Sequence, residues 1–467
     1  MNLRLLATDA MTLPALSEQQ REALLATVRL LTQVAFGSLI VLSPFRARWE
    51  LAARPAGSVY GDYTDFLLYW SDVAFVAVLA LWALSLLISG KRPWLGPAVI
   101  RWPVVALMVA TWASIPFSVD APLSAYSALR LTAAVLLGLY VANEVSLRQL
   151  ALPLAVMVGL QAVVGVSQAI DQGSVGLYGL GEYRLDVNAG GTSVVWSDVG
   201  PRQLRAYGLT DHPNILGGLL AVSLLLIGGV AARARSEWTA LFGTVFAIGC
   251  VALVLTFSRG AGLAMAMALV LVFGLLALRR DRRTFIGWAG ICVAAFVLCL
   301  TLVKPYGDYL SIRTGLLESG PTSSTEQRAI SEREALAKAT NEIFVSRPLL
   351  GVGAGGLPTA MSERFPDFSY FYQPAHFALL TVAAETGLVG GMAYGALMVV
   401  PFFLLWWRRK ELTPDLVAVS GALLAVTLIG LLDYYTWTLA PGRILFWLVL
   451  GLWVAEYARR SEAPADA

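Results

Sequence analysis

Long apolar runs separated by mostly short polar connections dominate the chain from end to end. A helix that crosses the hydrocarbon core of a bilayer needs about 20 mostly apolar residues, and about twelve runs reach that length. The tenth run is the longest, and it can tilt or break near Gly390–Gly391. The pattern predicts an all-α polytopic membrane protein, with residues 1–467 forming a single membrane domain. The runs are approximately 26–45, 66–89, 97–117, 123–142, 148–170, 213–232, 237–257, 259–278, 285–303, 376–407, 414–432 and 442–458.

Two polar connections, 171–212 and 304–375, are much longer than the others. Both contain aromatic and apolar residues, which argues against disorder, and long connections in a compact domain are usually functional. Within the second, residues 322–348 predict a helix that begins at Ser324 or Thr325 and ends at Pro348. One face of this helix is charged and the other is apolar, so we expect it to lie along the membrane surface.

Basic residues gather in the connections on one side of the predicted topology. Cytoplasmic loops carry an excess of Lys and Arg, so this side is expected to be cytoplasmic, with both chain termini there and both long connections outside. The N-terminal segment lacks the compact apolar core and cleavage site of a signal peptide, so the first run is expected to remain as a helix. The cytoplasmic set is Lys91, Arg92, Arg148, Arg233, Arg235, Arg279, Arg280, Arg282, Arg283, Arg408, Arg409, Lys410, Arg459 and Arg460, and the outer set is Arg46, Arg48, Arg54, Arg259 and Arg443.

Composition excludes several classes of function. Charged residues make up 14% of the chain, against about 25% in soluble proteins, and a net charge of +3 gives no indication of nucleic-acid binding. The cysteines Cys250, Cys292 and Cys299 lie in apolar runs and are expected to be small core residues. With only two histidines and no cysteine cluster, no metal site is predicted. The chain has no P-loop, GxSxG or dinucleotide motif, and no cofactor is predicted.

Two arginines at the outer boundary are candidates for binding an anion. Arg259 opens the eighth run in "LTFSRGAG", and Arg205 precedes the sixth in "RAYGLTDHPN". Charge near the hydrocarbon is costly and often functional. The arginine fork suits phosphate oxygens, and helix starts offer free N–H groups. The alternatives are an arginine that reaches to lipid headgroups for Arg259 and an ordinary loop arginine for Arg205.

His376 opens the tenth run, and its unperturbed pKa lies near neutral pH. It can act as a general base on a hydroxyl group, although a lone histidine is also often structural. His212, followed by proline, can cap the sixth run, as can Asp211. Asp62 and Asp65 form an acidic pair that fits catalysis or a solvated loop.

Acids are scarce within the runs themselves. Glu385 is the clear exception, and Asp433 lies near an outer end. Ion-coupled transporters usually place several ionisable groups near the middle of the bilayer. The sequence therefore argues against an ion-driven carrier.

Four motifs, "RAYGLTDHPNILGG", "LTFSRGAGLAMA", "SRPLLGVGAGG" and "HFALLTVAAETGLVGG", follow one another over about 200–395. In this order the sequence resembles the O-antigen ligase and polymerase superfamily. The resemblance implies a glycosyltransferase that takes a glycan from undecaprenyl pyrophosphate. It implies that His376 is the catalytic base and that Arg205 and Arg259 bind pyrophosphate. His212 and Arg347 are candidates for a supporting role, although a structural role fits Arg347 equally well. Phe377 follows the histidine where many relatives have Asn.

The expected enzyme is a metal-independent, inverting ligase of the bacterial inner membrane, with its site on the outer face and a lipid A–core sugar as acceptor. Two arginines and helix N-termini can stabilise a departing pyrophosphate. A polymerase of lipid-linked repeats and a protein O-oligosaccharyltransferase share this chemistry. A multipass transporter or flippase and a structural membrane protein are alternatives of other classes.

Overall fold

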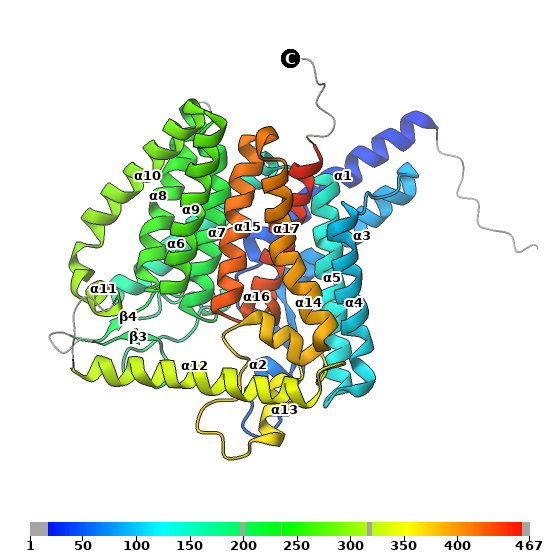
Figure 1. The fold of residues 1–467 in the computed structure, drawn as a ribbon. Coiled ribbons are helices and arrows are strands. Elements are labelled where there is room, and N and C mark those ends of the chain that lie inside the picture. The colour runs from blue at the N-terminus through cyan, green and yellow to red at the C-terminus, as the bar shows by residue number, and fades with distance from the viewer. Residues whose placement is uncertain (1–16, 197–200, 235, 315–319, 460–467) are drawn as a thin grey trace, which may run out of the picture.

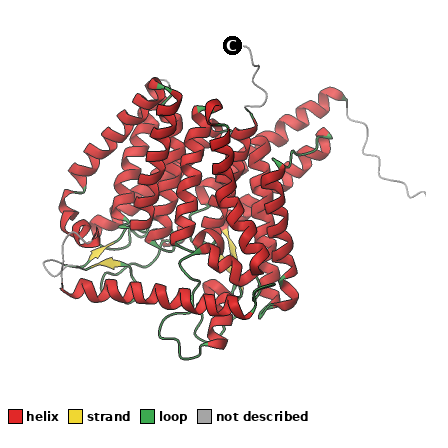
Figure 2. Cartoon of the chain, in the orientation of Figure 1, coloured by secondary structure: helices red, strands yellow, loops and turns green. Residues whose placement is uncertain are grey.

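The computed structural model describes residues 17–196, 201–234, 236–314 and 320–459, most of them in helices (Figure 2). Among these residues, 11 helices are long and apolar enough to cross a membrane. They confirm the predicted fold class and match the first eleven predicted runs. They are α1 (Glu18–Leu42), α3 (Trp70–Ser89), α4 (Ala98–Ala113), α5 (Ala121–Glu144), α6 (Leu147–Asp171), α7 (Pro213–Ala231), α8 (Ser236–Leu255), α9 (Arg259–Arg279), α10 (Arg282–Leu302), α14 (Ala378–Trp407) and α15 (Pro414–Leu432).

The twelfth predicted run is α17 (Ala440–Ala458), which carries Arg443 and Glu456 and is not among the eleven. It is almost wholly buried and packs between α5 and α15. Small residues allow the close approach of α5 and α17, because a Cβ on Gly451 would meet the backbone of Gly138. Such contacts are typical of helices packed in membranes, where small residues let backbones approach. The buried centre of the bundle therefore consists of α7, α15 and α17.

Shorter elements connect the long helices. The strands β1 (Arg48–Ala52) and β2 (Phe66–Tyr69) pair antiparallel on either side of α2 (Gly61–Thr64), with a bulge between Glu50 and Ala52. The strands β3 (Val194–Val195) and β4 (Gln203–Leu204) form a second pair. With α11, α12 and α13, strands β3 and β4 lie at one end of the bundle, while α16 (Tyr435–Thr438) precedes α17 (Figure 1). The helices are α11 (Gly307–Thr314), α12 (Gly320–Ser346) and α13 (Leu357–Arg364).

The predicted surface helix of the second long connection is α12, which runs across this end of the bundle (Figure 1). It begins at Gly320, ahead of the predicted start at Ser324 or Thr325, and ends at Ser346, two residues before Pro348. Its apolar face is buried at Leu336 and Ile343. The helix packs on α13 and α14, so its predicted amphipathic face meets protein.

Helix α14 is broken at Gly387, where φ is 77° and ψ is −179°. The break lies three residues before the predicted Gly390–Gly391, because contacts with another segment decide its position. The amides of Val352 and Gly353 donate to the carbonyls of Ala384 and Glu385 (3.0 and 2.9 Å), and the amide of Leu388 donates to the carbonyl of Pro348 (2.8 Å). These bonds replace those lost within α14 and fix the segment after α12 against it.

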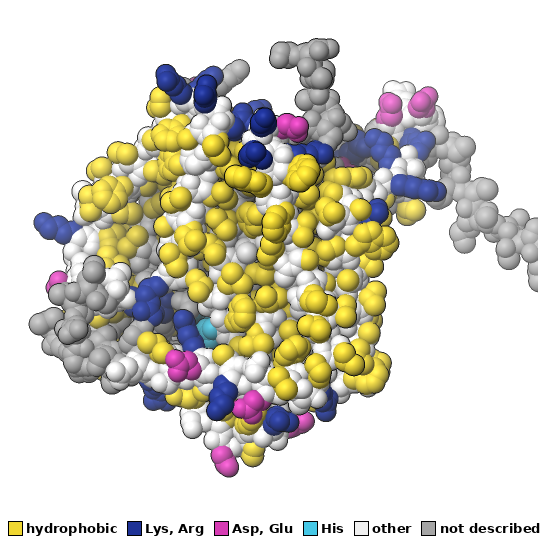
Figure 3. Space-filling view, in the orientation of Figure 1, with side chains coloured by type: hydrophobic (Ala, Val, Ile, Leu, Met, Phe, Trp, Pro, Cys, Tyr) yellow, Lys and Arg dark blue, Asp and Glu magenta, His cyan; other side chains and the backbone are white. Residues whose placement is uncertain are grey.

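The two ends of the bundle differ in charge. Figure 3 shows Lys and Arg side chains gathered at the end opposite α12, and Figure 1 places the start of α1 and the end of α17 there. Arg235 and Arg460, which the sequence analysis also assigned to this side, lie outside the described residues. By the positive-inside rule, this arrangement is the one expected if both termini are cytoplasmic.

Candidate active site

Both histidines of the chain line one cavity of about 370 Å³ beneath α12. We call it the histidine cavity, and Figure 3 shows a histidine in a hollow at this level. Its walls come from the hairpin after α1, the segment before α7, α11, α12, and the segments that flank α14 and α16. The polar residues that line it are Arg48, Asp62, Tyr63, Tyr69, Arg205, Asp211, His212, Asn214, Arg313, Glu332, Arg333, Gln373, His376, Asp433, Tyr434 and Tyr435.

Arg205 is the most buried cation of the cavity, with 4% of its surface exposed. It donates from Nε to the carbonyl of Thr256, from Nη1 to Oγ of Ser193 and from Nη2 to Oδ1 of Asn214, at 2.7, 2.8 and 2.7 Å. All three acceptors are neutral, and Arg205 forms no ion pair with any described residue. Burial, reinforced by nearby arginines, lowers its pKa to about 9. A buried guanidinium without a carboxylate favours the binding of an anion.

Arg259 lines a second pocket, which adjoins the histidine cavity. It is the first residue of α9, and the side chain of the preceding N-cap Ser258 makes no capping bond. The start of α9 adds a partial positive charge at this pocket. The two spaces share Asn214, Arg313, Arg333, Asp433 and Tyr435.

The turn between α8 and α9 orients two of the arginines. Phe257 has a φ of 49°, a left-handed conformation that is uncommon for a bulky residue. The carbonyl of Thr256 accepts from Arg205, and the carbonyl of Phe257 accepts from Nε of Arg313 at 3.3 Å. Successive carbonyls of one tight turn thus hold arginines from both long connections.

His376 lies two residues before α14 and is half-buried. Its ring packs edge-on against Tyr434, with 5.1 Å between ring centroids, and its Nδ1 is buried without a hydrogen-bond partner among the described residues. Burial lowers the pKa of His376, the Asp433 carboxylate opposes this, and Arg333 adds to it. The imidazole is therefore neutral at neutral pH and able to accept a proton.

His212 caps α7, as the sequence allowed, because its Nδ1 accepts from the amide of Asn214 at 3.1 Å. Burial, with the charge of Arg205 next in importance, places its pKa well below the usual value. Asp211, the other predicted cap, instead forms an ion pair with Arg46 at 2.6 Å. His212 thus positions the start of α7, and with it Asn214, against the cavity.

The comparison with known families bears directly on this site. Residues 244–395 match the family model described as O-Antigen ligase. The matched segment is an O-antigen ligase domain. The match confirms the resemblance and indicates a membrane glycosyltransferase of the ligase and polymerase family. A search of curated proteins finds no match to the chain.

The O-antigen ligase domain runs from α8 into α14 and contains Arg259, Arg313, Arg333 and His376. Arg205 and His212 lie before it, in the first long connection. The described part of the chain contains no group of three or more His, Cys, Asp or Glu side chains placed to hold a metal ion.

One candidate from the sequence analysis, Arg347, lies apart from the others. Arg347 is exposed, lies outside the lining of both spaces, and donates from Nη1 to the carbonyl of Phe117 at 3.1 Å. This hydrogen bond joins the end of α12 to the turn after α4. It gives Arg347 a structural contact away from the arginines of the two spaces.

Sequence reasoning also missed several lining residues. Arg333 shares the cavity face of α12 with Ala329 and Glu332, a spacing that the predicted amphipathic helix already contained. Arg313 lies on α11, for which no helix was predicted. The acidic pair of the first outer connection is divided in the structure. Asp62 forms an ion pair with Arg48 at the cavity wall, whereas Asp65 accepts from the amide of Arg54 at 2.6 Å.

Proposed function

We propose that this protein transfers a glycan from undecaprenyl pyrophosphate to a sugar hydroxyl of lipid A–core. The observation that carries the proposal is a pair of adjoining spaces: Arg205, Arg313 and Arg333 line the cavity that contains His376, and Arg259 lines the pocket next to it. Of the described residues that line the pocket beside Arg259, three are arginines (Arg259, Arg313 and Arg333) and one is an acid (Asp433), an excess of positive charge that suits a ligand with two phosphate charges. A neutral imidazole suits the removal of a proton from an alcohol.

In the proposed reaction the oxygen of the acceptor hydroxyl attacks the anomeric carbon of the glycan. The bond from that carbon to the pyrophosphate oxygen breaks, and its electron pair leaves with the polyprenyl pyrophosphate. The hydroxyl proton passes to His376, and the arginines balance the developing charge, so that no metal is required. Attack opposite the leaving group inverts the anomeric centre.

Each part of the chain has a role in this proposal. Connections 171–212 and 304–375 together with His376 supply half of the polar residues that line the histidine cavity, while the long helices hold them at one membrane level. The concentration of Lys and Arg at the opposite end favours a bacterial inner-membrane orientation with the site on the outer face. His212 and Asn214 would position Arg205.

In the test, purified protein is incubated with a labelled glycan on undecaprenyl pyrophosphate in the presence of EDTA. Each reaction contains one of three acceptors: lipid A–core, a second lipid-linked glycan or a protein. Labelled lipid A–core supports the ligase. A lengthened lipid-linked glycan would instead assign a polymerase, and labelled protein an oligosaccharyltransferase. If no acceptor is labelled while the donor crosses the membrane of a proteoliposome, the protein is a flippase and the proposal fails.

A further inference from the structure

One wall of the histidine cavity is a chain of hydrogen-bonded polar and aromatic side chains. Glu332 on α12 accepts from Nε2 of Gln373 at 2.9 Å, and Oε1 of Gln373 accepts from the hydroxyl of Tyr434 at 3.1 Å. The hydroxyl groups of Tyr434 and Tyr63 share a further hydrogen bond of 2.8 Å. The ring of Tyr434 also packs against His376, so the chain of contacts ends at the proposed base.

This wall continues outside the cavity as a pair of exposed aromatic rings. Tyr60 and Phe371 expose 49% and 57% of their surfaces, and their ring centroids are 5.0 Å apart. Tyr60 lies three residues before Tyr63, and Phe371 lies two residues before Gln373, so two short segments join the rings to the cavity. We call this set the aromatic wall: Tyr60, Tyr63, Glu332, Phe371, Gln373 and Tyr434.

The aromatic wall offers the groups that bind a sugar. Glu332 is half-buried at the cavity, and its Oε2 accepts no hydrogen bond from the described residues. After the bonds above, the amide of Gln373 still has one N–H and one oxygen lone pair to offer. A carboxylate can accept from two adjacent hydroxyl groups, and an aromatic ring can pack on the C–H face of a pyranose.

The balance of charge favours a neutral sugar at this wall. Arginines and acids are equal in number, four of each, among the described residues that line the histidine cavity. The pocket beside Arg259 has three arginines and one acid, and neither Glu332 nor Tyr434 lines it. The excess of positive charge that a pyrophosphate requires therefore lies in that pocket and not at the aromatic wall.

We propose that the aromatic wall binds the acceptor glycan. Its terminal sugar, a neutral pyranose, lies against Tyr434 with two adjacent hydroxyl groups at Glu332 and a further hydroxyl at His376. The next sugar stacks on Tyr60 and Phe371. This inference rests on the proposed function, which supplies the donor and the reaction.

The direction of attack assigns this wall to the acceptor and not to the glycan of the donor. An inverting attack comes from the side opposite the leaving group. With the donor pyrophosphate in the pocket beside Arg259, the attacking hydroxyl comes from a wall that does not line this pocket. Glu332, Gln373 and Tyr434 belong to such a wall.

Binding can be measured without transfer by saturation-transfer difference NMR on the full-length protein in nanodiscs. The probes are core oligosaccharide freed of lipid A and, separately, the donor glycan freed of its pyrophosphate. We expect core oligosaccharide to bind, about tenfold more weakly in Glu332→Gln, which loses a charge-assisted hydrogen bond. Phe371→Ala should weaken binding about fivefold through loss of stacking. Binding of the donor glycan alone, or equal binding by wild type and both variants, would overturn the inference.

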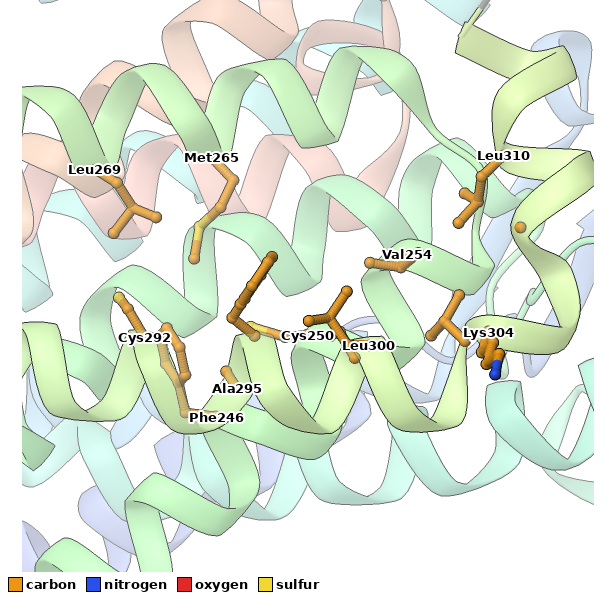
Figure 4. A pocket seen from close by; sticks show the side chains of 14 residues that line it. Phe246, Cys250, Val254, Met265, Leu269, Cys292, Ala295, Leu300, Lys304 and Leu310 are labelled. Atoms are coloured by element: carbon orange, nitrogen blue, oxygen red, sulfur yellow. The ribbon is translucent and has the colours of Figure 1, made fainter. Parts of the chain in front are cut away.

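A matched control for Phe371→Ala is Phe296→Ala on α10. Phe296 is 63% exposed and lines an apolar groove between α8, α9 and α10, together with the three half-buried cysteines (Figure 4). It lies outside the aromatic wall, so Phe296→Ala should bind core oligosaccharide as wild type does. An equal loss of binding in both variants would show a general effect of removing an exposed ring and would overturn the inference.

Steady-state kinetics separates the acceptor from the donor. Glu332→Gln should raise the KM for lipid A–core about tenfold and leave the KM for the donor unchanged. A rise in the donor KM alone would assign the wall to the donor glycan and overturn the inference. A protein that binds core oligosaccharide at this wall but transfers nothing would contradict the proposed function alone.

Discussion

At the scale of single residues, the proposed transfer reaction depends on how the side chains of Arg205 and His376 are positioned. The sequence suggested both because each stands at the entrance of an apolar run. It did not show that Arg205 is buried on three neutral acceptors, because Ser193 and Thr256 reach it from distant parts of the chain. Nor did it show that Asp433 raises the pKa of His376 while Arg333 lowers it.

A carboxylate introduced beside Arg205 should compete with the donor. Ser193 accepts from Nη1 of Arg205 and does not line the histidine cavity, so Ser193→Asp changes charge without filling the space. We expect the KM for the donor to rise at least about tenfold, because the added carboxylate partly cancels the positive charge of Arg205. Steady-state kinetics will measure this, with Ser193→Ala as control and a thermal midpoint to exclude misfolding. An unchanged KM in Ser193→Asp would mean that Arg205 does not bind the donor.

The pH dependence of transfer should follow the surroundings of His376. The base is active when neutral, and its pKa lies below the usual value, so activity should fall only as pH drops below about 6.5. Arg333→Gln removes a cation and should move this acid limb to higher pH, whereas Asp433→Asn removes an anion and should move it to lower pH. Profiles of kcat/KM will measure both shifts. Shifts in the same direction would contradict the assignment.

At the scale of elements, the apolar runs predicted the spanning helices because length and hydropathy are local properties. The predicted break in α14 is present, but it lies three residues before Gly390 because hydrogen bonds from Val352, Gly353 and Leu388 decide its position, and no local pattern encodes them. The same bonds place α12, and hence Arg333, over the cavity. The amphipathic pattern predicted that helix but not what its apolar face would meet.

Replacing Gly387 should disturb this connection. Its φ is 77°, and a Cβ there would collide with the carbonyl of Leu349. Gly387→Ala is expected to destabilise the protein by about 1–3 kcal/mol. Thermal unfolding in detergent will measure this. Gly274→Ala, at a helical glycine with no heavy atom within 4 Å of the added Cβ, is the control and should be neutral or slightly stabilising. Equal midpoints would show that the break tolerates a side chain.

At the scale of the whole molecule, residues from Arg48 on β1 to Leu439, the N-cap of α17, line one cavity at one end of the bundle. The predicted topology placed Arg205, His212, Arg259 and His376 at this common level, because all four fell at the outer boundary of the runs. It did not predict that two polar spaces adjoin, which depends on the packing of α11 and α12 over the helix ends.

The proposed orientation can be tested by labelling single cysteines in cells. After the native cysteines are replaced, Ser369→Cys should react with an impermeant maleimide in cells whose outer membrane alone is opened. Arg283→Cys should react only after the inner membrane is opened. Both positions are exposed, so access is set by the membrane. The reverse pattern would place the cavity on the cytoplasmic side.

The central claim is that the arginines and His376 together transfer a glycan. The most direct measurement compares transfer by wild type, His376→Ala, Arg259→Ala and Arg347→Ala in EDTA. Loss of the base should cost about 10²–10⁴-fold in rate and loss of Arg259 about 10²–10³-fold. Arg347→Ala removes an arginine outside both spaces and should retain wild-type activity. If folded His376→Ala transfers as fast as wild type, His376 is not the base and the account is wrong.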